Sequence, residues 1–194
     1  KIPFLSTWNA SDIITSDHHL YFGRPGLFGN RVSNFAIQSC DLLIVLGSRL
    51  SVPITGYQMK NFSPHAKKII VDIDKKEIIK RKLKTSLSVI NDVGIYLNEL
   101  NKKLKNINQK VSWVNKLKKL RQSLDEDNKY KKNKNHVNSF RFINSLSRIL
   151  TGNQNLVTDM GTSFTCTMQS FKTKRNQRLF TSSGIAAMGF GLPG

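Results

Sequence analysis

Residues 41–49 read Asp-Leu-Leu-Ile-Val-Leu-Gly-Ser-Arg, and the five apolar residues at 42–46 end at a glycine. A second run, Lys-Ile-Ile-Val-Asp-Ile-Asp, fills residues 68–74, and Leu-Val-Thr-Asp at 156–159 is a third. Runs that are continuously apolar, rather than alternating, are typical of strands covered on both faces, as in parallel sheets. We therefore predict buried parallel strands at these three places.

Helical patterns lie between the predicted strands. Residues 33–39 precede the first strand, and residues 75–83 open with Lys-Lys-Glu directly after the second. Such alternation is typical of α/β proteins. We predict an α/β fold with a doubly wound, Rossmann-like parallel sheet, followed by the first part of a second α/β domain that begins near Asn155. Residues 1–5 are also expected to form a strand.

The middle of the chain has a different pattern. Between residues 90 and 124, apolar residues recur at spacings of three and four, which predicts an amphipathic helix with a break near residues 106–109. Lysines fill its other face, either as a solvated surface or as a docking surface for a partner or for acidic lipid. Residues 125–136 are charged and polar and predict a linker.

A further helix is predicted at residues 139–150, with Ser139 as its N-cap and Gly152 closing it. The chain begins inside a predicted strand and ends on a glycine-rich turn, so we expect a fragment truncated at both ends. The predicted divisions are a first domain at 1–124, a linker at 125–136 and the start of a second domain at 137–194.

Composition argues against several classes of protein. The 194 residues include 31 Lys and Arg against 12 Asp and Glu, a net charge of +19. A basic surplus suggests nucleic acid binding, yet lysines outnumber arginines 22 to 9, whereas base and phosphate recognition favours arginine. No apolar run is long enough to span a bilayer, and Cys40 and Cys166 lack the spacing of a zinc site or a disulfide framework. We expect a cytoplasmic protein that binds neither nucleic acid nor membrane.

Polar residues follow the first two predicted strands, where open parallel sheets bind their ligands. Arg49 could hold a phosphate, and Asp72 and Asp74 could accept hydrogen bonds from ribose hydroxyls. Asp74 could equally cap the following helix. These residues suggest a nucleotide site, although the chain has no Gly-x-Gly-x-x-Gly motif.

The third predicted strand is followed by Gly161, Thr162 and Ser163, which could form a phosphate cradle at a helix start or act as ordinary capping residues. Near the end of the chain, residues 180–193 place small residues and glycines around Met188. This pattern lets a flat ring lie against bare backbone, with Met188 as an apolar support.

These pieces together resemble the thiamine diphosphate (ThDP)-dependent enzymes of the acetolactate synthase (acetohydroxyacid synthase large subunit) family. The resemblance covers nearly the whole chain. Its motifs are Gly-Leu-Phe-Gly at 26–29, Cys-Asp-Leu-Leu-Ile-Val-Leu-Gly-Ser-Arg-Leu at 40–50, Val-Asp-Ile-Asp at 71–74, Asp-Val at 92–93, Thr-Asp-Met-Gly at 158–161 and the stretch 183–193. It implies most of a middle domain and the opening of a pyrophosphate-binding domain.

The resemblance also implies roles in binding ThDP. Thr162 and Ser163 match the positions that contact the diphosphate, where the family has Gln-His, and Gln169 matches a glutamine of the same stretch. The residues matched to the aminopyrimidine site are Ala186, Ala187 and Met188. The implied activity is decarboxylation of a 2-keto acid and transfer of the remaining unit to a second carbonyl.

Further parts of the implied machinery lie outside this chain. The catalytic glutamate belongs to a preceding domain, and the Gly-Asp-Gly…Asn motif that holds Mg²⁺ would follow Gly194. We therefore expect no catalytic residue and no metal ligand in this chain, and no turnover by the chain alone.

Synthases of this family also bind FAD in the middle domain. The matching positions are Gly26, Ser48, Arg49, Asp72, Ile73, Asp92 and Val93. Two departures argue against FAD: Phe28 replaces a family histidine, and Leu-Ser-Val at 50–52 replaces Phe-Asp-Asp.

The expected partners are a small 2-keto acid and further copies of the protein, as a homodimer or homotetramer. Two alternatives stay open. One is a catalytically incompetent relative that binds a nucleotide or acts as a scaffold, and the other is a ThDP enzyme with a different substrate.

Overall fold

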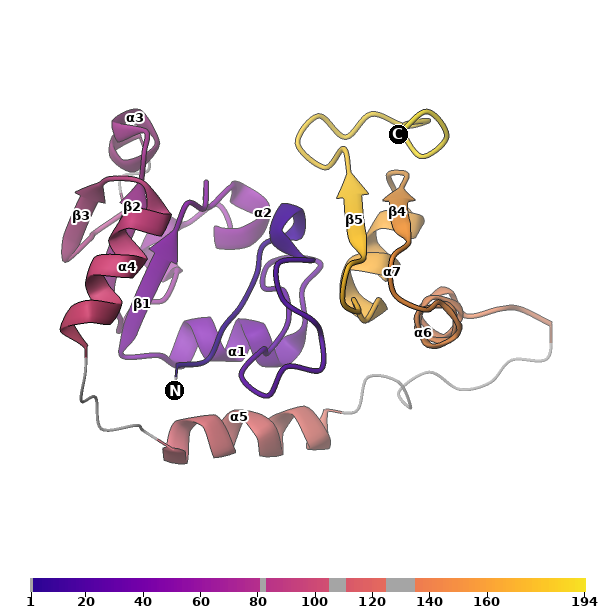
Figure 1. Cartoon of the computed structure of the whole chain (residues 1–194), viewed down its shortest axis with the longest axis horizontal. Coiled ribbons are helices and arrows are strands. Elements are labelled where there is room, and N and C mark those ends of the chain that lie inside the picture. Colours follow the sequence, from indigo (N-terminus) through magenta and orange to yellow (C-terminus); the bar gives the residue numbers. More distant parts are fainter. Residues whose placement is uncertain (1, 81–82, 105–110, 125–134) are drawn as a thin grey trace. The chain divides into compact units, whose positions relative to one another are not determined.

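The computed structural model describes residues 2–80, 83–104, 111–124 and 135–194 (Figure 1). The chain forms two compact units, which are described separately. One unit contains residues 34–110, and the other combines residues 1–33 with residues 111–194. The predicted domain boundaries at 124 and 136 stay a prediction, and residues 125–134 of the predicted linker lie outside the described residues.

The unit at 34–110 is built on a three-stranded parallel sheet. Strands β1 (Leu42–Leu46), β2 (Lys67–Asp72) and β3 (Leu87–Ile90) pair in the order β1-β2-β3. Ile70 and Val71 of the central strand are fully buried, as the continuous apolar run predicts, whereas in β1 only Val45 is buried and Leu42 is exposed, so the predicted burial was wrong for most of β1. The expected parallel strands and α/β class are therefore confirmed in this unit.

Helices flank this sheet and connect its strands. The helical elements are α1 (Arg31–Ser39), α2 (Val52–Thr55), the 3₁₀ turn η2 (Met59–Asn61), α3 (Lys75–Ile79) and α4 (Val93–Lys103). Helices α3 and α4 both contact β2. Each of the two begins with an aspartate N-cap, Asp74 for α3 and Asp92 for α4.

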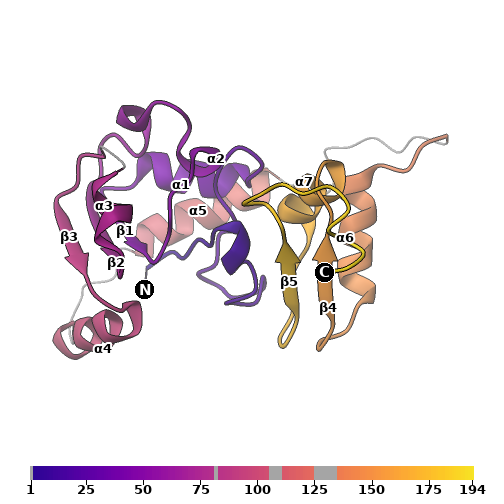
Figure 2. The same ribbon diagram turned by 90° about the horizontal axis from the view of Figure 1, so that it is seen from above.

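The other unit contains a βαβ arrangement. Strands β4 (Asn155–Thr158) and β5 (Arg178–Thr181) pair in parallel, with helix α7 (Thr162–Ser170) between them in sequence. Helix α6 (Ser139–Ile149) packs against α7 (Figure 2). The third predicted strand is thereby confirmed. Helix α5 (Val111–Ser123) and the 3₁₀ turn η1 (Trp8–Ala10) also belong to this unit.

Residues 2–33 pack against α7 and β5. The rings of Trp8 and Phe164 pack edge to face, with 4.9 Å between their centres. The carboxylate of Asp12 accepts hydrogen bonds from Arg178 Nε (2.9 Å) and Leu179 N (3.0 Å). The strand predicted at 1–5 was wrong, because its described part forms one isolated bridge, Phe4 with Tyr21. Pro3 has no N–H to donate to a ladder.

The predicted helix between residues 90 and 124 is two helices, α4 and α5, and the predicted break at 106–109 lies outside the described residues. The N-cap of α6 is Asn138 rather than Ser139, since the Asn138 side chain accepts from Arg141 N at 3.1 Å. Leu150, in an extended conformation, ends α6 before Gly152 is reached. None of the described helices has the length and hydropathy of a membrane-spanning segment.

Candidate functional site

The carboxyl ends of β4 and β5 carry the two segments predicted to bind ThDP. Because the strands are parallel, both segments leave the sheet at the same edge. Helix α7 follows β4, and its N-cap is Gly161, whose φ of 79° is in the left-handed region. A glycine supplies no side chain to cap the first turn, so the N–H groups of that turn are open to a ligand.

Thr162 and Ser163 begin α7, and both are exposed. The Ser163 hydroxyl donates to Asp159 O at 2.9 Å and lies 3.1 Å from Met160 O. The hydroxyl therefore serves the turn that precedes α7, as an ordinary capping residue does. Its oxygen keeps lone pairs, and rotation about χ1 would aim its proton at an anion instead.

Residues 182–194 follow β5 as a series of turns. The backbone N–H of Gly189 donates to both carboxylate oxygens of Asp159, at 2.9 and 3.0 Å. At Gly191, an added Cβ would lie 3.0 Å from Asp159 Cβ and from Asp159 N, so this position accepts no larger side chain without movement. Asp159 thus ties the turn after β5 to the loop after β4.

The turn presents apolar side chains to solvent. Met188 is 90% exposed and Ile185 is 87% exposed, while Ala186 has a left-handed φ of 60°. The predicted pyrimidine-site residues Ala186, Ala187 and Met188 therefore lie on the same turn that Asp159 holds. Exposed backbone beside a thioether provides a surface on which a flat ring can pack.

Gln169 is not brought together with Thr162 and Ser163. It lies seven residues further along α7, which corresponds to roughly 10 Å of helix. Its carbonyl oxygen accepts from Asn30 Nδ2 at 2.9 Å. The structure therefore places Gln169 at the opposite end of the helix from the other predicted ThDP residues.

The predicted FAD residues, other than Gly26, lie at the carboxyl ends of β1, β2 and β3. They are Ser48, Arg49, Asp72, Ile73, Asp92 and Val93. Gly26, with a φ of 113°, belongs to the other compact unit. The structure thus groups six of the seven residues at one sheet edge.

Local hydrogen bonds occupy part of that edge. Asp72 Oδ1 accepts from Asp74 N at 3.0 Å, and Asp92 Oδ1 accepts from Ile95 N at 3.0 Å. Asp74 caps α3 by accepting from Lys76 N at 2.8 Å, so the capping role is confirmed. Arg49 lies 3.5 Å from Glu77 and is largely exposed. Oδ2 of Asp72 and Asp92 can still accept a hydrogen bond from a ribose hydroxyl, so these acceptors fit a nucleotide.

Neither cysteine has the properties of a nucleophile. Burial raises the pKa of the Cys40 thiol and of the Cys166 thiol above the ordinary value, so both stay protonated at neutral pH. Among the described residues, no group of three or more His, Cys, Asp or Glu side chains could hold a metal ion.

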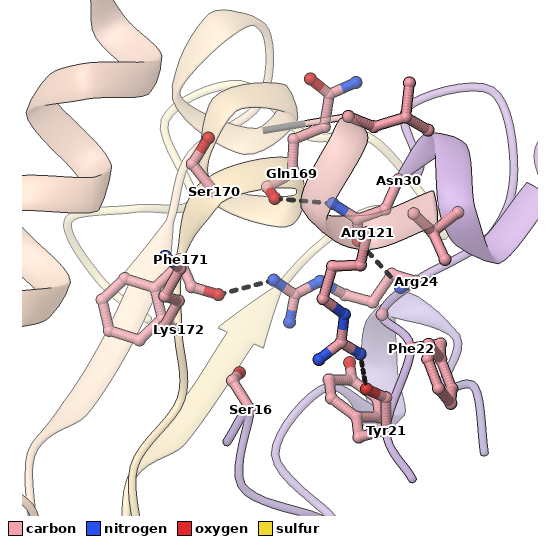
Figure 3. Close-up of a pocket in the computed structure, with 13 residues that line it drawn as sticks. Ser16, Tyr21, Phe22, Arg24, Asn30, Arg121, Gln169, Ser170, Phe171 and Lys172 are labelled. Atoms are coloured by element: carbon pink, nitrogen blue, oxygen red, sulfur yellow. Dashed lines mark hydrogen bonds between the residues drawn. The ribbon is translucent and has the colours of Figure 1, made fainter. Parts of the chain in front are cut away.

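Arg24, to which no sequence pattern assigned a role, is 3% exposed. Its Nε donates to Met168 O at 2.6 Å. Its Nη2 donates to Phe171 O at 2.7 Å (Figure 3). Both acceptors are carbonyls at the C-terminal end of α7, where a cation is favourable. The only local signal is the Gly-Arg-Pro-Gly run at 23–26, and the partners of Arg24 are more than 140 residues away in the sequence.

Comparison with known proteins identifies the family. Residues 1–100 match the family described as "Thiamine pyrophosphate enzyme, central domain". The chain belongs to this family. The resemblance inferred from the motifs is thereby confirmed, and the parallel sheet of β1, β2 and β3 lies within the matched residues.

The whole chain is also similar to acetolactate synthase large subunits. It is 31% identical to the probable acetolactate synthase large subunit of Methanocaldococcus jannaschii, 32% to the acetolactate synthase large subunit of Cyanidium caldarium and 30% to the acetolactate synthase isozyme 2 large subunit of Escherichia coli. Each similarity covers 100% of this chain and 33%, 33% and 34% of these relatives, respectively. The chain therefore spans about a third of the length of these relatives.

Proposed function

We propose that this chain is part of a ThDP-dependent 2-keto acid decarboxylase and carboligase of the acetolactate synthase type. The observation that carries the proposal is the pair of hydrogen bonds from Gly189 N to Asp159. These bonds join the loop before Thr162 to the turn that bears Met188, so both predicted halves of the cofactor site meet at one sheet edge. The similarity to acetolactate synthase large subunits supports the same activity.

The N-terminus of α7 would bind the diphosphate of the cofactor. Backbone N–H groups of the first turn point out of the helix, and the helix dipole favours negative charge there. The hydroxyls of Thr162 and Ser163 add donors in place of the family's Gln-His pair. Gln169, at the far end of α7, would act only on the position of the helix.

The turn at 182–194 would hold the aminopyrimidine. Ala186 and Ala187 leave the backbone open to the ring, and Met188 would pack against it and exclude water. When bound, ThDP supplies the electron sink for loss of carbon dioxide from a 2-keto acid. The residues of this chain contribute binding and orientation. We propose that the catalytic glutamate and the ligands of Mg²⁺ lie outside it, so that the chain alone is inactive.

The direct test is calorimetry of ThDP and Mg²⁺ binding to the full-length protein and to Met188→Ala. Loss of the apolar contact should weaken binding about tenfold, since a buried methionine side chain contributes about 1.5–3 kcal/mol. Ile149→Ala is the matched control, because Ile149 is 79% exposed and lies at the far end of α6. Binding in the wild type with no effect of Met188→Ala would reject the assignment of this turn.

The same experiment separates the alternatives. Absence of ThDP binding by the folded full-length protein would favour the incompetent relative that binds a nucleotide or acts as a scaffold. Binding without turnover of pyruvate and other 2-keto acids would favour a different substrate.

The edge formed by Ser48, Arg49 and Asp72 would bind a nucleotide, for which FAD is the family's candidate although Phe28 and residues 50–52 depart from the family pattern. Its support is the available carboxylate oxygens of Asp72 and Asp92 and the exposure of Arg49. Flavin absorbance of the purified protein tests whether FAD binds at this edge. We further propose a cytoplasmic homodimer or homotetramer, which light scattering and cell fractionation would test.

A further inference from the structure

A cavity of about 220 Å³ lies at the C-terminal end of α7, within the unit that combines residues 1–33 and 111–194. Three cationic side chains line it: Arg24, Arg121 and Lys172. Hydroxyl groups of Ser16 and Ser170 contribute to the same wall. The described residues that line the cavity include no aspartate and no glutamate.

Arg24 is the centre of this site. Its Nε and Nη2 donate to carbonyls of Met168 and Phe171, but its buried Nη1 has no hydrogen-bond partner among the described residues. Figure 3 shows this third nitrogen directed away from Phe171, into the space between Ser16 and Arg121. A buried, unpaired donor on a charged group is unfavourable unless something accepts from it.

Arg121 brings a second guanidinium to the same space. Its Nη2 donates to Tyr21 O, and its guanidinium carbon lies 4.6 Å from the centre of the Phe22 ring. These contacts fix the stem and the plane of the group, so that its remaining N–H donors have a defined direction. Burial lowers the pKa of Arg24 and of Arg121, which reports that both charges are partly removed from water. Both stay charged at neutral pH, as arginines do.

Two partly desolvated guanidinium groups line this cavity, and the described residues supply no carboxylate there, so an anion between them would compensate their charge. Guanidinium groups match the oxygens of phosphate and sulfate through paired donors. We propose that this cavity binds a small tetrahedral oxyanion of the phosphate class, held by Arg24 Nη1 and Arg121. This site is separate from the N-terminus of α7, because the two lie at opposite ends of that helix.

The test is thermal unfolding of the full-length protein in increasing inorganic phosphate, compared with chloride at the same ionic strength. We expect a saturable rise of the unfolding midpoint with phosphate only. Arg121→Gln removes the charge but keeps an amide donor on the side chain, and it should weaken the apparent phosphate affinity about tenfold. Lys118→Gln removes one charge from the same helix outside the cavity and should leave the affinity unchanged.

Two further variants keep the test decisive. If Arg121→Gln fails to fold, Lys172→Gln takes its place in the test. Lys172 is at an exposed position of the cavity lining, and its substitution should lower the phosphate affinity. Ser163→Ala reports separately on phosphate bound at the N-terminus of α7, which is the diphosphate site proposed above. Equal midpoints in phosphate and chloride would overturn the proposal. A phosphate effect reduced by Ser163→Ala but not by Arg121→Gln or Lys172→Gln would overturn it too.

Discussion

The two parallel sheets of this protein use the aspartates at their carboxyl edges differently. At the edge of β1, β2 and β3, Asp74 and Asp92 each cap the helix that follows them. At the edge of β4 and β5, helix α7 starts at Gly161 without a side-chain cap, and Asp159 instead holds Gly189. An aspartate that accepts hydrogen bonds from a neighbouring turn leaves the N–H groups of the first helical turn available. An aspartate that caps the helix occupies one of those N–H groups. The difference explains why the diphosphate is assigned to α7 rather than to α3 or α4.

Arg24→Met should give the largest effect. The substitution leaves the carbonyls of Met168 and Phe171 without their charged donor inside the protein, and we expect a loss of about 3 kcal/mol in the free energy of unfolding. Urea unfolding followed by circular dichroism measures the loss. Arg49→Met, at a side chain that is 76% exposed, should change it by less than about 0.5 kcal/mol. Equal losses for the two variants would contradict the role of Arg24 at the end of α7.

Asp159→Ala should have the second largest effect. It removes two hydrogen bonds from Gly189 N to a carboxylate, and charge-assisted bonds are worth about 1.5–3 kcal/mol. We expect ThDP affinity to fall at least about tenfold, because the turn that carries Met188 is no longer held. Calorimetry measures this change. Wild-type affinity in a folded Asp159→Ala protein would show that the tie between the two segments has no part in binding.

Asp92→Ala should lower the free energy of unfolding by about 1 kcal/mol, since it removes the cap of α4. Asp92→Ser keeps a capping oxygen and should restore most of that loss. ThDP affinity should stay the same in both variants. If Asp92→Ser restores stability but not the binding of a nucleotide, the carboxylate has a second role at the edge of β1, β2 and β3.

Ser163→Ala should have the smallest effect. Its hydroxyl makes a local bond to Asp159 O, so we expect a change of no more than about 0.5 kcal/mol in the free energy of unfolding. ThDP affinity should fall a few-fold, because one donor to the diphosphate is lost. Unfolding and calorimetry on the same preparation compare the two quantities. A large loss of stability with unchanged affinity would assign Ser163 to capping alone.

The sequence predicted the strands that have continuous apolar runs, and it missed two others. Strand β3 contains Leu-Ser-Val-Ile with mostly exposed positions, and β5 contains Arg-Leu-Phe-Thr with a single buried position. Serine interrupts the apolar residues of β3, and β5 has only two apolar residues between Arg178 and Thr181, so neither sequence contains the continuous apolar run that the prediction required. The structure identifies β3 by its pairing with β2, and β5 by its pairing with β4.

The candidate site was predictable where its residues are neighbours in sequence. Gly161, Thr162 and Ser163 indicate an open helix start from their own order. The link from Asp159 to Gly189 spans 30 residues, and the bond from Arg24 to Met168 spans 144. Local patterns do not contain such pairs, because they depend on which elements the fold brings together. Gln169 shows the converse, since its nearness to Thr162 in sequence did not place it at the same end of α7.

The distance in sequence between Arg24 and Met168 has a consequence for synthesis of the protein on the ribosome. At about 5–20 residues per second, roughly 7–30 s separate the addition of these two residues. During that time residues 34–110, which form a unit of their own, are completed and can fold. Trp8 cannot make its contact with Phe164, nor Arg24 its hydrogen bond to Met168, until α7 has been made. The unit that combines residues 1–33 and 111–194 can therefore be completed only after residues 34–110 have been made.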